Sequence, residues 1–133
     1  MNDRLPLTDG RPALSRLATE RRTGVLNVQI SNAAVQVYRA HTGRGPTKSR
    51  TYIDNNLVVV ELRETLTSGE RNLIAAGQLD VVTEMRRAYR ALIHEPLVDA
   101  VEGLLDRKVL ALLSDNNLDP DVAVEVFVLE PED

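Results

Sequence analysis

Residues 42–46, Thr-Gly-Arg-Gly-Pro, constrain the fold of this chain most strongly, because no regular element can run through them. Glycine readily takes the left-handed conformation that ends a helix, so the sequence predicts a helix C-terminus at Thr42-Gly43. Pro46 has no amide hydrogen and pushes Gly45 into extended geometry. We therefore expect one element to end at residue 42 and another to begin a few residues later.

The element before this break is predicted to be an amphipathic helix. From Leu26 to His41, apolar side chains recur at helical spacing and polar ones fill the other positions. Residues 1–23 show little periodicity, and they are expected to form a flexible or partly helical tail, with a short helix at about 12–22.

The element after the break is predicted to be a β-hairpin. Two extended runs, about Arg50–Ile53 and Leu57–Arg63, are joined by Asp54-Asn55-Asn56, and Asn tolerates the positive φ of a tight turn. Both faces of the second run are partly apolar. A helix layer is expected to cover one face, and something else part of the other.

Helices follow this hairpin. Thr67-Ser68-Gly69-Glu70 has the pattern of a capping box and predicts a short helix that ends near Gly77. A longer apolar stripe from Val82 to Leu105 is interrupted by Pro96. It predicts either one long helix kinked near that proline or two helices in near succession.

A second hairpin is expected at the end of the chain. Val109–Leu113 is an apolar strand, Ser114–Asp121 is predicted to be a polar loop, and Val122–Glu130 is a strand. In the last strand, alternation places one set of side chains on a common face: Ala123, Glu125, Phe127 and Leu129.

This order predicts an α+β fold in which two β-hairpins, each preceded by helix, form a four-stranded antiparallel sheet with the helices packed on one face. Residues 24–131 would form this single domain. One helix layer can cover only one face of a sheet whose two faces are both partly apolar, so we also expect a homodimer.

Composition excludes several classes of protein. The chain has no cysteine, and therefore no disulfide framework, thiolate zinc site or cysteine nucleophile. No apolar run approaches the roughly 20 residues that span a bilayer, and no signal-peptide core is found at the N-terminus. Net charge is −4 and aromatics are only 3%, without a basic reading helix, so nucleic-acid binding is not expected.

The candidate binding site is the basic loop, which consists of Gly43, Arg44, Gly45, Pro46, Thr47, Lys48 and Arg50. Two interpretations stay open. The loop is either a structural junction whose cations pair with the acidic segment 109–133, or a contact site for an anion or a partner. It lacks the P-loop pattern and runs from a helix into a strand, so its amides do not open a helix.

No catalytic, metal or cofactor site is predicted. His41 and His94 each lack a second ligand at helical spacing, and the acidic residues between 115 and 121 lack the spacing of a calcium loop. No nucleophile–base arrangement is recognisable. The sequence therefore favours a protein that is not an enzyme.

Gly43-Arg44-Gly45-Pro46-Thr47-Lys48-Ser49-Arg50-Thr51-Tyr52-Ile53 resembles the signature of a small bacterial family labelled MpsC, after a sodium-translocating membrane-potential-generating system. The similarity continues through about residues 24–131, including Leu66–Glu70 and Glu125–Glu130.

The resemblance implies association with membrane ion or inorganic-carbon transport. Without a spanning segment, the chain is expected to be a cytoplasmic accessory or regulatory subunit, free or peripheral to the inner face of the membrane, with a membrane transporter as partner. The alternative is a domain that binds or senses a phosphate or nucleotide, or an unrecognised enzyme, at the same basic loop.

Overall fold

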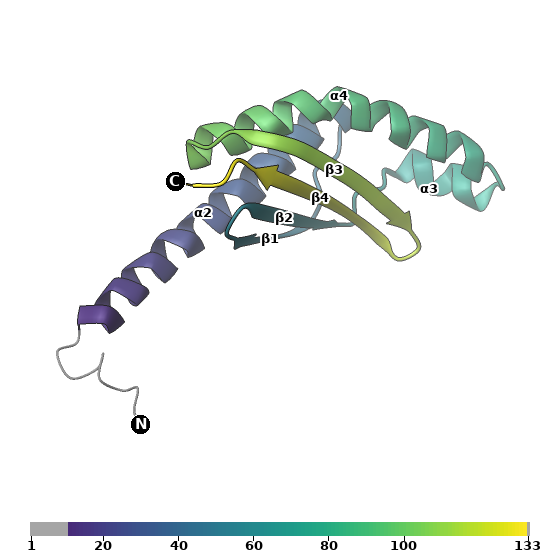
Figure 1. The fold of residues 1–133 in the computed structure, drawn as a ribbon. Helices are drawn as coiled ribbons and strands as arrows, with labels where there is room; N and C mark the ends of the chain where they lie inside the picture. The colour runs from purple at the N-terminus through teal and green to yellow at the C-terminus, as the bar shows by residue number, and fades with distance from the viewer. Residues whose placement is uncertain (1–10, 133) are drawn as a thin grey trace.

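The computed structural model describes residues 11–132, with side chains from residue 14. The elements follow in the order α2 (Arg11–Thr42), β1 (Lys48–Asp54), β2 (Leu57–Arg63), α3 (Ser68–Ala75), α4 (Leu79–Leu105), β3 (Val109–Leu118) and β4 (Asp121–Leu129). The long helices α2 and α4 pack on the same side of the sheet (Figure 1). The predicted α+β fold is confirmed.

The sheet is antiparallel throughout, in the order β1-β2-β4-β3. The two hairpins therefore meet through their second strands, and Val60 lies opposite Glu125 at the middle of that seam. The first strands, β1 and β3, form the two outer edges. Residues close to residue 50 and residues close to residue 115 consequently lie on opposite edges of the sheet.

The core lies between the sheet and the two long helices. It contains Ile30, Ala34 and Tyr38 of α2, together with residues of α4 such as Ile93 and Leu97. Alternation in the central strands points one set of side chains into this layer and the other set away from it. The buried central-strand side chains are Val58, Val60, Leu62, Ala123, Glu125, Phe127 and Leu129.

Helix α2 begins earlier than the sequence suggested. The short helix expected at about 12–22 and the amphipathic helix that follows it are one continuous helix, and its N-terminal part extends beyond the sheet (Figure 1). Gly24 lies within it, exposed, without breaking it. Residues 1–10 of the expected tail lie outside the described residues, and the division into a tail and a domain stays a prediction.

The first hairpin has the predicted turn. Asn55 takes a positive φ of 55°, and only Asn55 and Asn56 separate the strands. Strand β1 is longer than predicted and already begins at Lys48, because Lys48 pairs with Arg63. Lys48 and Arg50 of the basic loop therefore belong to a strand.

The prediction of a polar loop at Ser114–Asp121 is wrong. Strand β3 continues to Leu118, and only Asp119 and Pro120 form the turn. Polar side chains that suggested a loop find partners on the helix-covered face instead, where the Ser114 hydroxyl bonds Glu125 and Asn116 accepts from Arg90 at 2.6 Å. Those bonds make a polar strand stable beside a helix layer.

Helices α3 and α4 follow the predicted pattern. The capping box is present, with the Glu70 amide donating to Thr67 Oγ1 at 3.1 Å and the Thr67 amide donating to Glu70 Oε1 at 2.9 Å. Of the two alternatives at Pro96, a single helix is the one observed. Figure 1 shows α4 as one gently curved helix along the sheet.

Candidate functional site

Gly43 ends α2 as predicted. Its φ is +79°, and its amide donates to the Arg39 carbonyl at 3.0 Å. The Thr42 hydroxyl donates to the Tyr38 carbonyl at 2.8 Å, so a further carbonyl of the last turn is satisfied. The glycine is needed because a side chain is strained in the left-handed region.

Gly45 and Pro46 have a packing role. A Cβ added at Gly45 would lie 3.0 Å from Arg39 Nε and 3.1 Å from Val35 Cγ1, closer than such atoms normally approach. Pro46 is buried next to it. Close approach of the loop backbone to α2 therefore accounts for both residues without a ligand.

The remaining loop groups are tied to the segment after β2. The Thr47 amide donates to the Arg63 carbonyl at 3.2 Å, and the Thr47 hydroxyl bonds the Glu64 carboxylate. Arg44 Nε donates to the Glu64 carbonyl at 3.2 Å, while the Arg44 amide donates to Thr42 Oγ1 at 3.3 Å. Several amides of the loop are thus used within the chain, which argues against a phosphate cradle built from its backbone.

The three cations of the basic loop, Arg44, Lys48 and Arg50, do not gather at one place. Arg44 turns back to the Glu64 carbonyl, whereas Lys48 and Arg50 stand on β1, on the sheet face away from the helices. The Arg50 guanidinium carbon lies 6.0 Å from the centre of the Tyr52 ring. The structure therefore brings Gly43–Thr47 together as a junction and separates Lys48 and Arg50 from it.

A groove opens beside Lys48, at the end of the sheet where β1 begins. It has a volume of about 600 Å³ and lies between the end of β2, α3 and the turn between β3 and β4. Its lining combines charged side chains of both signs with apolar side chains. The lining residues are Lys48, Arg63, Glu64, Leu66, Arg71, Ile74, Ala75, Leu118, Asp119, Pro120 and Asp121.

Sequence reasoning missed this groove. Only Lys48 belongs to the predicted site; Arg71 lies on α3, and Asp119 lies in the turn that follows β3. Pairing of β2 with β4 brings these distant segments together. No pattern of neighbouring residues in the sequence indicates that these segments come together.

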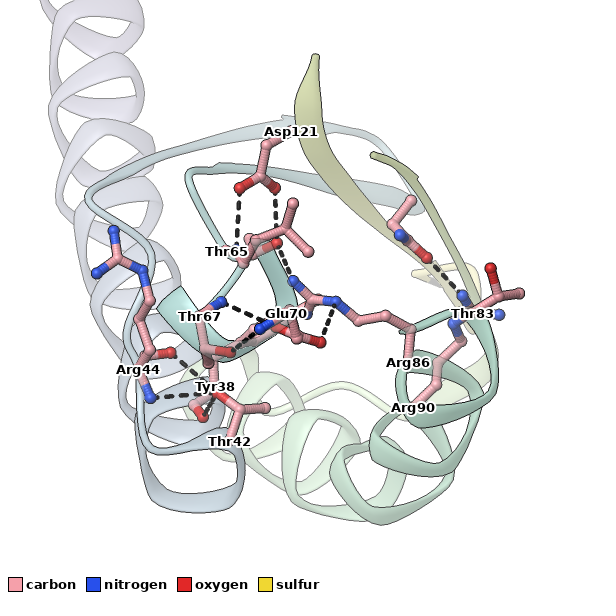
Figure 2. A network of polar contacts seen from close by, with 12 residues as sticks. Tyr38, Thr42, Arg44, Thr65, Thr67, Glu70, Thr83, Arg86, Arg90 and Asp121 are labelled. Carbon is pink, nitrogen blue, oxygen red and sulfur yellow. Dashed lines mark hydrogen bonds and ion pairs between the residues drawn. The ribbon is translucent and has the colours of Figure 1, made fainter. Parts of the chain in front are cut away.

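A buried polar network holds one wall of the groove in place (Figure 2). The Asp121 carboxylate accepts from the Thr65 hydroxyl at 2.8 Å and from the Leu66 amide at 2.9 Å. Arg86 donates to Thr65 Oγ1 at 2.7 Å, and its Nε lies 3.2 Å from Glu70 Oε2. Through Thr65 and Arg86, the network joins Asp121, the first residue of β4, to Glu70 in the first turn of α3.

A second polar cluster lies under the sheet. Glu125 is buried among core side chains, where its carboxylate accepts from Tyr38 at 2.5 Å and bonds the Ser114 hydroxyl. Burial raises the pKa of Glu125, although both hydrogen bonds and the charges of Arg90 and His94 lower it. Burial, together with Glu125, also raises the pKa of Tyr38.

Sequence alternation could have found this second cluster. Glu125 falls in the same alternating set as Phe127 and Leu129, which marks it as an acid on a core face. Glu61 points to the other face of the sheet, so the two glutamates cannot act as a pair. Only about 20 Å³ of space remains beside Glu125, too little for a substrate.

Between residues 11 and 132, no group of three His, Asp or Glu side chains is placed to hold a metal ion. Within that range, no helix combines the length and apolar character that crossing a membrane requires.

Comparisons with known proteins give one match. Residues 22–131 match the family described as "Na+-translocating membrane potential-generating system (MpsC)". Neither the curated proteins nor the solved structures yielded a match. Because the match covers most of the chain, this protein belongs to the MpsC family.

Proposed function

We propose that this chain is a non-enzymatic accessory or regulatory subunit of the membrane-potential system that names its family, and that it docks on a membrane-protein partner through the groove beside Lys48. The family name supplies the link to a membrane ion-transport system. As part of the same proposal, the chain works in the cytoplasm, at the inner face of the membrane.

The observation that carries this proposal is the mixed lining of the groove. Lys48 and Arg71 line it together with Asp119 and with apolar side chains such as Ile74 and Leu66. Protein–protein interfaces combine an apolar core with a polar rim, and this groove offers apolar and polar side chains together. A site for a small anion would instead carry an excess of cations and free amides.

The rim around the groove also suits docking. The contacts that run from Asp121 through Thr65 and Arg86 to Glu70 tie the start of β4 to α3 before any partner arrives. A preformed surface loses little conformational freedom on binding, so more of the contact energy appears as affinity.

A nucleotide or other phosphate-bearing ligand is the second candidate. Three cations, Lys48, Arg63 and Arg71, line the groove, and its volume lies in the range of small-molecule sites. Arg63 is already paired with Glu61 at 3.0 Å, and the nearby loop amides are used within the chain. These contacts favour the partner over the phosphate.

One experiment separates the candidates. The tagged full chain is used to capture proteins from detergent-solubilised membranes, beside Lys48→Glu/Arg71→Glu and a matched control, Arg87→Glu/Lys108→Glu, whose positions lie outside the groove. Recovery of one polytopic membrane protein by the wild type and the control, but not by the groove variant, supports docking. Equal recovery by all three chains overturns docking through the groove.

The second arm adds nucleotides and inorganic phosphate to the purified protein and records the melting temperature. The docking proposal predicts no shift that depends on Lys48 and Arg71. A shift at micromolar ligand that the groove variant abolishes and the control retains supports the phosphate ligand instead.

A further inference from the structure

The sheet face away from the helices is a regular surface whose composition follows from the strand register. Each row crosses the four strands in the order β1, β2, β4, β3. The rows are Lys48–Arg63–Val122–Asn117, Arg50–Glu61–Val124–Asp115, Tyr52–Val59–Val126–Leu113 and Asp54–Leu57–Val128–Ala111. We call these sixteen side chains the open face.

The middle of the open face is apolar and open to solvent. Leu113 is 59% exposed, Tyr52 49% and Leu57 42%. Valines occupy all four positions of β4 on this face, and each is only partly buried. A contiguous apolar surface with a charged border marks an interaction surface rather than a solvent-facing one.

Charges on the border have opposite signs on opposite edges. Arg50 and Asp115 stand in the same row, Arg50 on β1 and Asp115 on β3. Neighbouring strands are about 4.8 Å apart, so three strand spacings separate these residues by roughly 14 Å, too far for an ion pair within the chain. Each is exposed.

We propose that a second copy of this chain covers the open face, with β1 of one protomer lying over β3 of its partner. A twofold axis that runs parallel to the strands, midway between the two stacked sheets, places β1 of each protomer over β3 of the other. Rotation about this axis does not shift residues along the strands, so each row lies over the same row of the partner. Arg50 then faces Asp115 of the other protomer twice, and Tyr52 faces Leu113. Such an interface is isologous, as expected for a homodimer.

Packing of stacked sheets is compatible with this arrangement. Aligned sheets pack about 10 Å apart and cross at roughly 30°, which keeps edge residues of the same row within reach of long side chains. One row further along the strands, Lys48 of one protomer likewise faces Asn117 of the other. The open face balances three cations against three acids, which argues against an anionic lipid surface as its occupant.

This inference does not rest on the proposed function, because the positions that its variants change, Arg50, Leu113 and Asp115, do not line the groove. Lys48 belongs to both surfaces, so Arg71→Glu alone is the groove variant that leaves the open face unchanged. If the protein does not dimerise, capture of a membrane protein through the groove can still be measured separately.

The test measures self-association of the full chain by sedimentation velocity over a concentration series. Wild type is expected to form a dimer, whereas Arg50→Asp and Asp115→Arg are each expected to weaken it about tenfold or more, because like charges then face each other twice. Circular dichroism checks that each exposed substitution leaves the fold intact. Asp99→Arg, an exposed change on α4, is the charge-matched control and should dimerise as wild type does.

Mixing the two weakened variants gives the deciding result. In a mixed dimer both cross-protomer contacts join opposite charges, so the mixture is expected to recover the wild-type affinity, as is the double variant Arg50→Asp/Asp115→Arg. Leu113→Asp should be monomeric in every mixture. A monomeric wild type, or a mixture no stronger than its parts, overturns the proposal.

Discussion

Arg86 Nε lies 3.2 Å from Glu70 Oε2, and both side chains are buried, at 7% and 1% exposure. The contact joins α4 to the first turn of α3. Its alignment is that of an ion pair and not of a hydrogen bond, since neither atom has a hydrogen-bonding partner within the described residues. A second nitrogen of Arg86 donates to Thr65, and the other carboxylate oxygen of Glu70 accepts from the Thr67 amide.

Breaking this pair on one side should destabilise the protein strongly. Arg86→Met leaves the Glu70 carboxylate buried without its cation, and loss of one partner of a buried pair typically costs about 3–5 kcal/mol. Glu70→Gln/Arg86→Met removes both charges and should recover much of that loss. Urea unfolding of the two single variants and the double variant measures the coupling; strictly additive effects would show that the residues do not act as a pair.

The Gly43 conformation gives a second prediction. Gly43→Ala forces an alanine to a φ of +79°, and the left-handed conformation costs a residue with a side chain about 1–2 kcal/mol. Gly103 lies inside α4 with no atom within 4 Å of an added Cβ, so Gly103→Ala should instead stabilise by about 0.5–1 kcal/mol. Denaturation midpoints with the same sign for both variants would refute the assignment of Gly43 as a helix cap.

The buried Glu125 predicts a pH dependence of stability. Since burial raises the pKa of this carboxyl in the folded chain, the folded state holds its proton at pH values where the unfolded chain has released it. The unfolding free energy contributed by Glu125 is therefore fully present below the ordinary carboxyl pKa. It falls as pH rises from that value through the raised pKa of the folded state.

Glu125→Gln should flatten this part of the stability profile, because glutamine stays neutral and still accepts from Tyr38. Urea unfolding from pH 4 to pH 8 compares the variant with wild type. His94→Gln, which removes the nearby imidazole and keeps the carboxyl, is the control variant. Parallel profiles for wild type and Glu125→Gln would contradict the raised pKa.

The Asp121 carboxylate should hold the linker before α3. It accepts from the Leu66 amide at 2.9 Å, and removal of one partner of a buried hydrogen bond costs about 1–3 kcal/mol. Asp121→Ala should therefore speed hydrogen exchange of the Leu66 amide much more than Asp99→Ala, which changes an exposed acid on α4. Unchanged exchange at Leu66 in Asp121→Ala would exclude this role.

Local signals in the sequence predicted the local structure well. Gly43 ends a helix and Thr67 begins one through contacts within four residues, so the chain needs no tertiary information to specify them. Alternation in β4 also placed Ala123, Glu125, Phe127 and Leu129 on one face, and the structure shows that this face is the buried one.

Features that depend on distant contacts could not be predicted. Ser114 and Asn116 look like loop residues until Glu125 and Arg90 are placed beside them. The sequence predicts the basic loop as one site, but β1 begins at Lys48 and points its alternate side chains to the open face. The groove exists only because the two hairpins pair through β2 and β4.

The proposed occupant of the groove beside Lys48 is a membrane-protein partner. The most direct measurement places a photo-crosslinking amino acid at Ile74, in the groove, and separately at Leu92, which is 58% exposed on α4 and outside it. The proposal predicts that light links position 74 to one polytopic membrane protein in living cells and that position 92 gives no such product. Absence of the product at position 74, or equal products at both positions, would contradict it.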